Sequence, residues 1–329
     1  MSRLIVLTGT AGFIGTHTAH ALLDSGCDVL GIDAFTDSYS PADKRRNVAT
    51  LTGRPGFRLL ERDLADGGLG PVMQGADAVI HLAAQAGVTC SWGPGFADYA
   101  RHNVLGTQAV LEGCHAADVP RLVAASSSSV YGDAPAYPCS EDARPHPVSP
   151  YGVTKLCTEH LCLAYAQPAL GELSMALLRF FTVYGPRQRP DMAFSRFITA
   201  ALAGRPVTVY GDGEQTRDFT YVSDVVQAIV ASLDAPLKAE IFNVGGGVRT
   251  SVNDVLSLLG RILGRPVDVT YAPARAGDVR DTGSDCSHAA AVLGYRPQVD
   301  LATGLTAEVE WRINGDGADR RAAAAAGTT

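Results

Sequence analysis

Short apolar runs alternate with longer amphipathic stretches through the first half of the chain. The runs are four to six residues long, which is typical of strands buried on both faces of a sheet. The predicted strands are Leu4–Thr8, Val29–Asp33, Phe57–Leu60, Ala78–Leu82, Arg121–Ser126 and Met175–Phe180. Helical patterns lie between several of them, such as Phe13–Asp24, which Ser25-Gly26 closes, and Asp98–Ala117. This alternation predicts an α/β fold whose parallel sheet is covered by helices on both faces.

The pattern beyond residue 180 is more mixed, and it predicts a smaller mixed α/β lobe. Its predicted strands are Val207–Tyr210, Ile241–Val244 and Val267–Tyr271, and its predicted helices are Met192–Ala203, Ser223–Leu233, Ser251–Leu263 and Leu301–Ile313. Ser223 is a candidate N-cap for the second of these helices. No Ser/Gly-rich linker separates the halves, so we expect the lobe to pack on the first domain.

These patterns suggest where the domains divide. We assign residues 1–180 to the larger domain, with residues of about 216–245 returning to it, and residues 181–313 mainly to the smaller lobe. The alanine-rich residues 314–329 are predicted to be a disordered tail.

Charge and composition exclude several classes of protein. A net charge of −7 argues against a general affinity for nucleic acid or anionic membranes, so an anionic ligand would need local Arg and Lys partners. No apolar stretch approaches the roughly 20 residues of a membrane-spanning helix, and no signal peptide is indicated. The seven cysteines form no CxxC pair and have no His-rich neighbours, so neither a metal site nor a disulfide framework is expected. We therefore predict a cytoplasmic protein with reduced cysteines.

A glycine-rich turn follows the first predicted strand and opens the first predicted helix. It comprises Thr8, Gly9, Thr10, Ala11, Gly12, Phe13, Ile14 and Gly15. Glycines at these positions allow backbone N–H groups and a helix N-terminus to approach a pyrophosphate closely. The turn therefore predicts a Rossmann-type, doubly wound parallel sheet that binds a dinucleotide. A nucleotide-free α/β domain remains the alternative.

Two acidic positions refine the choice of dinucleotide. Asp33 ends the second predicted strand, where a carboxylate accepts hydrogen bonds from the adenosine ribose and repels a 2′-phosphate. We therefore expect NAD rather than NADP. Asp63 and Leu64, which follow the third predicted strand, are expected beside the adenine.

A tyrosine and a lysine lie on one face of a predicted helix that Ser149-Pro150 introduces. Tyr151 and Lys155 have the i, i+4 spacing that places two side chains together. A tyrosine with a reference pKa near 10 is a poor base at neutral pH, and we expect the neighbouring ammonium and a nicotinamide ring to lower its pKa. The YxxxK spacing alone is common on exposed helix faces. Its coupling to the glycine-rich turn and to the serine run 126–129 makes a catalytic role more specific.

Together these motifs resemble the extended short-chain dehydrogenase/reductase family, in particular its nucleotide-sugar epimerases. The resemblance extends from Leu4 to about Trp311 and includes the segments His81-Leu82-Ala83-Ala84 and Arg217-Asp218-Phe219, together with Asn103 within a helix. It implies Tyr151 as the acid/base, Lys155 on the nicotinamide ribose, and Ser127 as the hydroxyl beside the tyrosine. It also implies cofactor contacts from Leu82, Ala83, Ala84 and Asn103, and a homodimer formed through the helices containing Asp98–Ala117 and Tyr151–Gln167. His81 is expected to be a hydrogen-bonded histidine at a strand end rather than an acid or base.

The same resemblance bears on the reaction. Relatives that remove water across carbons 5 and 6 carry Asp-Glu immediately before Val-Tyr-Gly, where this chain has Ser128 and Ser129. Relatives that decarboxylate UDP-glucuronate usually carry Glu at the position of Ser129. Both reactions are therefore disfavoured, and NAD-dependent 4-epimerisation through a 4-keto intermediate is expected.

The sugar is indicated by three segments that are similar to UDP-glucuronate 4-epimerases: residues 81–88, 125–132 and 179–192. Their resemblance implies that Arg189 contacts the substrate carboxylate, helped by hydroxyls of Ser127, Ser128 and Thr182. UDP-glucose/galactose 4-epimerases usually have Asn at the position of Thr182. The alternatives are such a neutral-sugar epimerase, a UDP-glucuronate decarboxylase, or an idle NAD-binding scaffold or sensor.

Further substrate contacts follow from the resemblance. Those expected near the sugar are Gln85, Gly87 and Val88, and those expected at the nucleotide are Val209, Tyr210, Arg217, Arg275 and Asp278. In this assignment Arg217 and Arg275 bind the diphosphate, Asp278 the ribose, and Val209 and Tyr210 flank the base. Structural salt bridges are the alternative role for both arginines, and a structural role is the alternative for Arg189.

Overall fold

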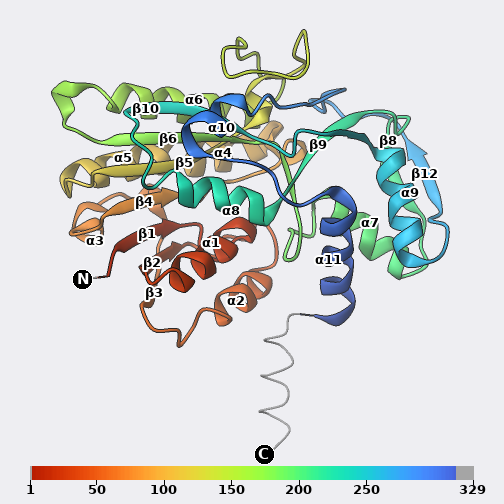
Figure 1. The fold of residues 1–329 in the computed structure, drawn as a ribbon, viewed down its shortest axis with the longest axis horizontal. Coiled ribbons are helices and arrows are strands. Elements are labelled where there is room, and N and C mark those ends of the chain that lie inside the picture. The colour runs from red at the N-terminus through yellow and green to blue at the C-terminus, as the bar shows by residue number, and fades with distance from the viewer. Residues whose placement is uncertain (1, 316–329) are drawn as a thin grey trace, which may run out of the picture.

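A seven-stranded parallel sheet forms the centre of the computed structural model, which describes residues 2–315 (Figure 1). Its strand order is β10-β6-β5-β4-β1-β2-β3, and every neighbouring pair is parallel. The strands are β1 (Leu4–Thr8), β2 (Asp28–Asp33), β3 (Phe57–Glu61), β4 (Ala78–His81), β5 (Arg121–Ser127), β6 (Ser174–Phe180) and β10 (Ala239–Val244). The predicted α/β fold with a parallel sheet is confirmed.

Two hydrophobic cores lie on the two faces of this sheet. Successive side chains of a strand point to opposite faces, so Ile5 and Leu7 of β1 join one core and Val6 joins the other. The first core is covered by α1 (Phe13–Asp24), α8 (Val222–Ala231) and α10 (Ser287–Leu293). The second is covered by α3 (Gly70–Met73), α5 (Gly106–Ala116) and α6 (Pro150–Tyr165). A further helix, α2 (Pro41–Ala49), contacts α1.

The order of the strands reverses at the centre of the sheet. β1 lies between β2 and β4, so the connections that follow β1 and β4 lead toward opposite edges. In doubly wound sheets such a reversal opens a crevice at the carboxyl ends of the strands. The glycine-rich turn after β1 and residues 82–88 after β4 meet in this crevice.

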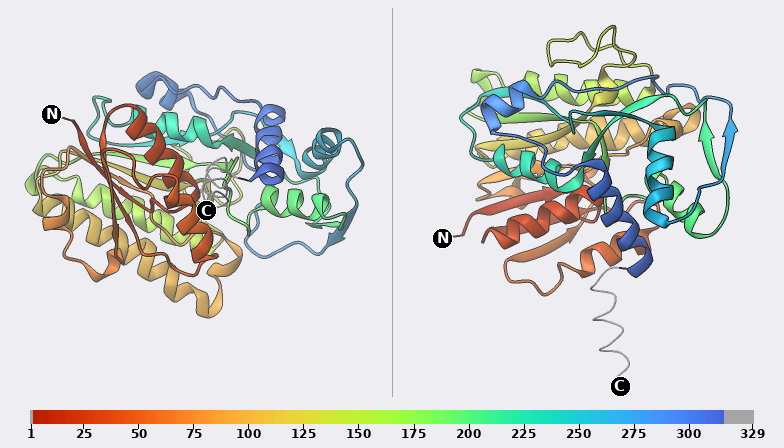
Figure 2. Two further views of the ribbon diagram at one scale, coloured as in Figure 1. Left: turned by 90° about the horizontal axis from the view of Figure 1, so that it is seen from below. Right: turned by 45° about the vertical axis from the view of Figure 1, so that its right-hand side comes forward.

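The second lobe stands beside the carboxyl ends of the strands (Figures 1 and 2). It contains the parallel pair β8 (Val207–Tyr210) and β12 (Val269–Ala272), and a three-stranded sheet of β7 (Thr182–Tyr184), β9 (Thr216–Tyr221) and β11 (Arg249–Ser251). Its helices are α7 (Ala193–Leu202), α9 (Val252–Leu263) and α11 (Leu301–Asn314). Phe194, Val209 and Leu259 belong to the separate hydrophobic core that these elements share.

Several boundaries differ from those predicted. The predicted helix Asp98–Ala117 is divided into α4 (Phe96–Tyr99), a π-helical turn at Ala100–Leu105, and α5. Ser223 is not the N-cap of α8, because the helix starts at Val222 and Tyr221 occupies the cap position without a side-chain bond. The strand predicted at Val267–Tyr271 begins at Val269. The short helical turns are Leu64–Asp66, Thr89–Ser91, Gly93–Gly95, Ser128–Val130 and Pro168–Leu170.

Residues 216–245 contribute to both parts of the molecule. β10 pairs with β6 in the large sheet and α8 packs on α1, whereas β9 belongs to the smaller three-stranded sheet. The division into domains therefore stays a prediction for this segment. Of the predicted tail, Asn314 ends α11, and residues 316–329 lie outside the described residues. Within residues 2–315, no helix has both the length and the apolar character needed to cross a bilayer.

Candidate active site

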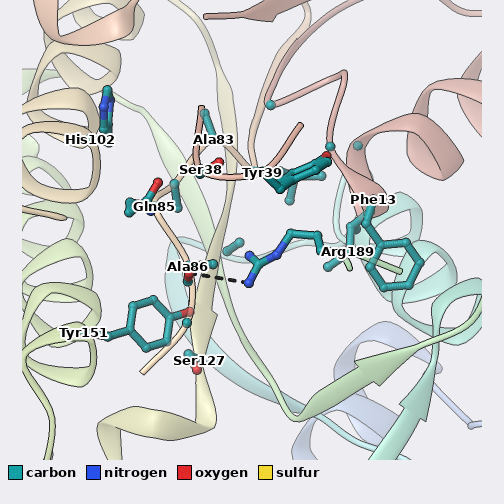
Figure 3. Close-up of a pocket in the computed structure, with 18 of the residues that line it drawn as sticks. Phe13, Ser38, Tyr39, Ala83, Gln85, Ala86, His102, Ser127, Tyr151 and Arg189 are labelled. Atoms are coloured by element: carbon teal, nitrogen blue, oxygen red, sulfur yellow. Dashed lines mark hydrogen bonds between the residues drawn. The ribbon is translucent and has the colours of Figure 1, made fainter. Parts of the chain in front are cut away.

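A cavity of about 710 Å³ lies at the carboxyl ends of β1, β4 and β5, against the second lobe (Figure 3). Most of the predicted site residues line it. Those from the cofactor prediction are Gly9, Gly12, Phe13, Ile14, Gly15, Asp33, Asp63, Leu64, Leu82, Ala83, Ala84, Tyr151 and Lys155. Those from the substrate prediction are Gln85, Gly87, Val88, Ser127, Ser128, Thr182, Arg189 and Arg275. Segments that are far apart in the sequence thus form one site.

The glycine-rich turn is too close-packed for side chains. Gly9 has a φ of +73°, and a Cβ there would lie 2.7 Å from the backbone nitrogen of Ala83. A Cβ on Gly15 would lie 2.0 Å from the carbonyl oxygen of Gly9. Because the turn has no side chains in these places, the N-terminus of α1 faces the cavity directly. This geometry fits the pyrophosphate of a dinucleotide.

The end of β2 forms a polar corner of the cavity. The Asp33 carboxylate accepts hydrogen bonds from the backbone N–H groups of Ala11, at 3.0 Å, and Phe35, at 2.8 Å. Burial raises the pKa of Asp33, and these two hydrogen bonds oppose that rise. The buried Lys44 donates to the carbonyl of Thr36 at 2.6 Å and to the Ser38 hydroxyl at 3.1 Å. Sequence reasoning missed Lys44, because a lysine in a polar helix resembles an exposed residue.

The segment after β3 forms another wall. Asp63 accepts a hydrogen bond from the backbone N–H of Ala65 at 2.9 Å and forms an ion pair with Arg101 at 2.9 Å. Its carboxylate therefore has protein partners, although the residue lines the cavity with Leu64. Asn103, which was predicted to contact the cofactor, is buried and does not line the cavity. Its side-chain amide accepts a hydrogen bond from the N–H of Gln85 at 2.7 Å and donates to the Gln85 carbonyl at 2.9 Å.

The two catalytic candidates lie in the first turns of α6. Ser149 caps this helix by accepting a hydrogen bond from the backbone N–H of Gly152 at 3.1 Å. Lys155 is buried and donates to the carbonyl of Ala125 at 3.0 Å. Burial lowers the pKa of Lys155 to about 8. Figure 3 shows Tyr151 directed toward Ser127.

The pKa of Tyr151 does not shift in the expected direction. Burial is the largest influence and raises it, while the hydrogen bond with Ser127 and the charge of Arg189 lower it. The Lys155 ammonium is held by the Ala125 carbonyl, and it is not among the groups that shift this pKa. Ser127 and Arg189, rather than Lys155, are therefore the residues that lower the pKa of Tyr151.

A buried ion pair supports the floor of the site. Arg179 of β6 donates to both carboxylate oxygens of Glu159 on α6, each at 2.8 Å, and both side chains are 2% exposed. Glu159 also accepts a hydrogen bond from the Ser126 hydroxyl at 2.5 Å. This network ties α6 to β5 and β6, and α6 and β5 are the elements that carry Lys155 and Ser127.

Arg189 extends into the cavity from the loop after β7 (Figure 3). Its Nη2 lies 3.4 Å from the carbonyl oxygen of Ala86 and forms an ion pair with Asp191 at 2.8 Å. The buried Gln188 anchors this loop, because its side chain donates to the Val183 carbonyl at 3.0 Å and accepts from the Ser195 N–H at 2.9 Å. Sequence reasoning missed Asp191, although it lies in the same motif as Arg189.

Four residues expected at the nucleotide do not line the cavity. Val209 is buried in the core of the second lobe, because inward-facing positions of β8 pack against α7 and α9. Tyr210 stacks with Arg275, whose Cζ lies 3.5 Å from the ring centroid. Arg217 and Asp278 form an ion pair with each other. The structure also adds Tyr39, Arg196 and His102 to the lining, and no spacing in the sequence signals these residues.

His81 behaves as a structural residue. Its ring nitrogens are hydrogen-bonded to the hydroxyls of Thr8, at 2.8 Å, and Thr107, at 3.1 Å. Burial lowers its pKa to about 3, so the ring is neutral. Within residues 2–315, no group of His, Cys, Asp and Glu side chains is placed to hold a metal ion.

The fold and the site define a dinucleotide-binding α/β protein of the dehydrogenase type, with a tyrosine and a lysine at the reactive end of the cavity. A family model described as the NAD dependent epimerase/dehydratase family matches residues 5–245. The chain belongs to this family, and its cofactor is NAD.

The chain is similar to several known proteins. The uncharacterized UDP-glucose epimerase YtcB of Bacillus subtilis is 43% identical, with 93% of this chain and 97% of that protein covered. A UDP-glucuronate 4-epimerase of Thermodesulfobacterium geofontis is 37% identical, with 93% and 95% covered. The crystal structure of a UDP-glucuronic acid 4-epimerase from Bacillus cereus, in complex with UDP-glucuronic acid and NAD, is 40% identical. It superimposes with a TM-score of 0.90 over 94% of this chain and 98% of that one.

Proposed function

We propose that this protein is an NAD-dependent UDP-glucuronate 4-epimerase, which interconverts UDP-glucuronate and UDP-galacturonate. One observation carries the proposal: Tyr151, Ser127 and Arg189 line the same cavity as the glycine-rich turn. The cavity thus combines an acid/base, a dinucleotide cradle and a cation for a carboxylate. The similarity to the epimerases of Thermodesulfobacterium geofontis and Bacillus cereus supports this choice of substrate.

The residues suggest how the proton is moved. Acceptance and return of a hydride is the chemistry that NAD supplies when bound. Tyr151, as the phenolate, removes the proton of the 4-hydroxyl, and Ser127 stabilises that phenolate through their hydrogen bond. Lys155 also lines the cavity and would hold the nicotinamide ribose of the bound NAD. The 4-ketose then turns to present its other face, and Tyr151 returns the proton with inverted stereochemistry.

The uronic acid imposes a further demand on the site. Oxidation at carbon 4 produces a β-keto acid, which loses carbon dioxide when its carboxylate aligns with the carbonyl π system. Arg189 and the hydroxyls of Ser127, Ser128 and Thr182 line the cavity where they can hold the carboxylate out of that alignment. Ser129 stands where decarboxylating relatives usually carry Glu, which disfavours the competing reaction.

Of the residues predicted to contact the nucleotide, only one lines the cavity. Arg275 lines the cavity and is a candidate for the diphosphate. Arg217 and Asp278 are paired with each other, so their proposed contacts to diphosphate and ribose require that this exposed ion pair opens. Tyr210 does not line the cavity but stacks on Arg275, which does.

The rival function is 4-epimerisation of a neutral hexose, as the name of the UDP-glucose epimerase YtcB suggests. The two functions differ at Arg189, which contacts a substrate carboxylate only if the sugar is a uronic acid. Purified protein is incubated with UDP-glucuronate and, separately, with UDP-glucose, and the products are resolved by proton NMR. We expect UDP-galacturonate from the first and little turnover of the second. A preference for UDP-glucose would favour the rival, and UDP-xylose would indicate a decarboxylase.

We also propose that the protein is a homodimer. Leu105 of the π-helical turn, and Val153 and Leu163 of α6, are exposed by 54%, 49% and 38%. α6 contacts both the π-helical turn and α5, so these apolar side chains belong to neighbouring helices. A second copy of the chain would bury them.

A further inference from the structure

Several arginines beyond residue 180 have carboxylate partners. The ion pairs are Arg189–Asp191, Arg217–Asp278, Arg249–Asp281 and Arg280–Asp212. Arg196 of α7 and Arg275, which follows β12, differ from these. Within residues 2–315, neither forms an ion pair with a carboxylate, and both line the active-site cavity.

The two unpaired guanidinium groups converge on one aromatic ring. The Cζ of Arg275 lies 3.5 Å from the centroid of the Tyr210 ring, and that of Arg196 lies 5.5 Å from it. Together the two guanidinium groups lower the pKa of the Tyr210 phenol, and Arg196 is the largest cause. Tyr210 therefore orients both cations on one surface.

Two like charges that share one aromatic ring repel each other, and a nearby anion relieves that repulsion. A neutral phenol accepts hydrogen bonds and presents an electron-rich face, but it does not cancel two positive charges. Since the described residues supply no carboxylate to either arginine, the missing negative charge is expected from the cavity that both groups line. Fixed guanidinium groups without a carboxylate partner are well suited to phosphate oxygens.

The position of the pair identifies which anion it suits. Arg189 is the arginine whose charge acts on Tyr151, so Arg189 belongs to the end of the cavity where the sugar reacts. Arg196 and Arg275 meet instead over Tyr210, the last residue of β8 in the second lobe. They form a second cationic surface of the cavity, and its two charges match the two charged groups of a diphosphate.

We propose that Arg196 is a substrate-binding residue that pairs with Arg275 to hold the diphosphate of the nucleotide sugar, with Tyr210 as the platform that orients both. The proposal rests on the proposed function in taking a nucleoside diphosphate sugar as the ligand. It adds a residue that no motif indicated, and it places the first diphosphate contacts on Arg196 and Arg275 rather than on Arg217.

The test compares the NAD-loaded wild type with two variants, Arg196→Gln and Arg205→Gln. Arg205 follows the same helix, is exposed and does not line the cavity, so its variant controls for the loss of one charge. Binding of UDP is measured by titration calorimetry at two salt concentrations, and binding of uridine by competition. Thermal unfolding of each protein verifies that it is folded.

We expect Arg196→Gln to weaken UDP binding about 10- to 100-fold, because it removes a charged hydrogen-bond donor. Uridine binding stays unchanged, the salt dependence of UDP binding becomes shallower, and Arg205→Gln behaves as the wild type. Equal affinity of the wild type and Arg196→Gln for UDP would overturn the proposal. An equal loss for uridine would also overturn it, since it would place Arg196 at the nucleoside.

The proposed function fails by a different result. Wild-type protein that binds UDP but forms no UDP-galacturonate would refute the epimerase assignment and leave the role of Arg196 intact. Normal epimerisation, together with unaltered UDP binding by Arg196→Gln, would refute the role of Arg196 and leave the epimerase assignment intact.

Discussion

Tyr151 is held at a high pKa by its surroundings, although its proposed reaction requires the phenolate. Burial raises the pKa, and the hydrogen bond from Ser127 is the largest influence that lowers it. Arg189 adds a second lowering influence through its charge. The hydroxyl of Ser127 therefore has a measurable task besides contacting the sugar: it increases the fraction of Tyr151 that is ionised at a given pH.

Replacement of Ser127 by Ala should move the pH dependence of turnover. Without this hydrogen bond the pKa of Tyr151 rises further, so at each pH a smaller fraction is phenolate. The ascending limb of the kcat–pH profile is then expected at higher pH than in the wild type, with lower kcat at neutral pH. A profile of reduced height but unchanged position would show that Ser127 acts only on the sugar.

Replacement of Tyr151 by Phe tests the role of the hydroxyl itself. The ring and its edge-to-face contact with Tyr99, at 6.0 Å between centroids, are retained, so NAD should remain bound. Turnover should fall by at least about 100-fold, the lower end of what acid–base catalysis contributes. Bound NAD is quantified after denaturation, and turnover by NMR. Unchanged turnover would remove Tyr151 from its proposed role.

Among single residues, the sequence predicted those cavity-lining positions that depend on short-range spacing. Gly9, Gly15 and Asp33 lie in the cavity as expected, because a strand and the turn that follows it have few possible geometries. Val209 and Arg217 were assigned by resemblance alone, and they lie in a hydrophobic core and in an ion pair. Lys44 and Arg196 carry no local signal, since their exposure depends on which element packs against them.

The elements that carry the catalytic residues are joined by the buried pair of Glu159 and Arg179. A buried ion pair adds little when intact, but loss of one partner leaves an uncompensated charge. Arg179 would retain a hydrogen bond to the Tyr131 hydroxyl, at 2.8 Å, which does not neutralise it. The pair therefore makes the alignment of α6 with β5 and β6 sensitive to a single change.

Glu159→Ala should lower the free energy of unfolding by about 3–5 kcal/mol. Glu310, an exposed glutamate of α11, provides the matched control, and Glu310→Ala should change stability by at most about 0.5 kcal/mol. Urea denaturation monitored by circular dichroism measures both. Equal stability of the two variants would show that the buried charge on Arg179 finds another partner.

The sequence predicted the long elements better than their interruptions. The periodicity of residues 98–117 is helical throughout, but a π-helical turn at Ala100–Leu105 divides it. The buried Asn103 lies within this turn, where its amide reaches the backbone of Gln85. Such a turn depends on tertiary hydrogen bonds, which apolar periodicity does not encode. The short β7 and β11 were missed because three residues show no period.

Across the whole molecule, the proposed dimer predicts the effect of charge on one apolar surface. The double variant Leu105→Glu with Val153→Glu should sediment as a monomer. Dimerisation would bury both carboxylates in the proposed interface, which is unfavourable. Val248→Glu alters a side chain that is 67% exposed in the second lobe and should leave the oligomeric state unchanged. Sedimentation velocity distinguishes these states. A monomeric wild type, or a dimeric double variant, would contradict the proposal.

The proposed chemistry makes a prediction about one hydrogen atom. The hydride removed from carbon 4 should return to the same carbon, because the cavity encloses both the dinucleotide cradle and Tyr151. UDP-glucuronate labelled with deuterium at carbon 4 is therefore incubated with the protein in ordinary water, and the products are analysed by NMR and mass spectrometry. We expect UDP-galacturonate that retains deuterium at carbon 4. Loss of the label to solvent, or UDP-xylose as the main product, would contradict it.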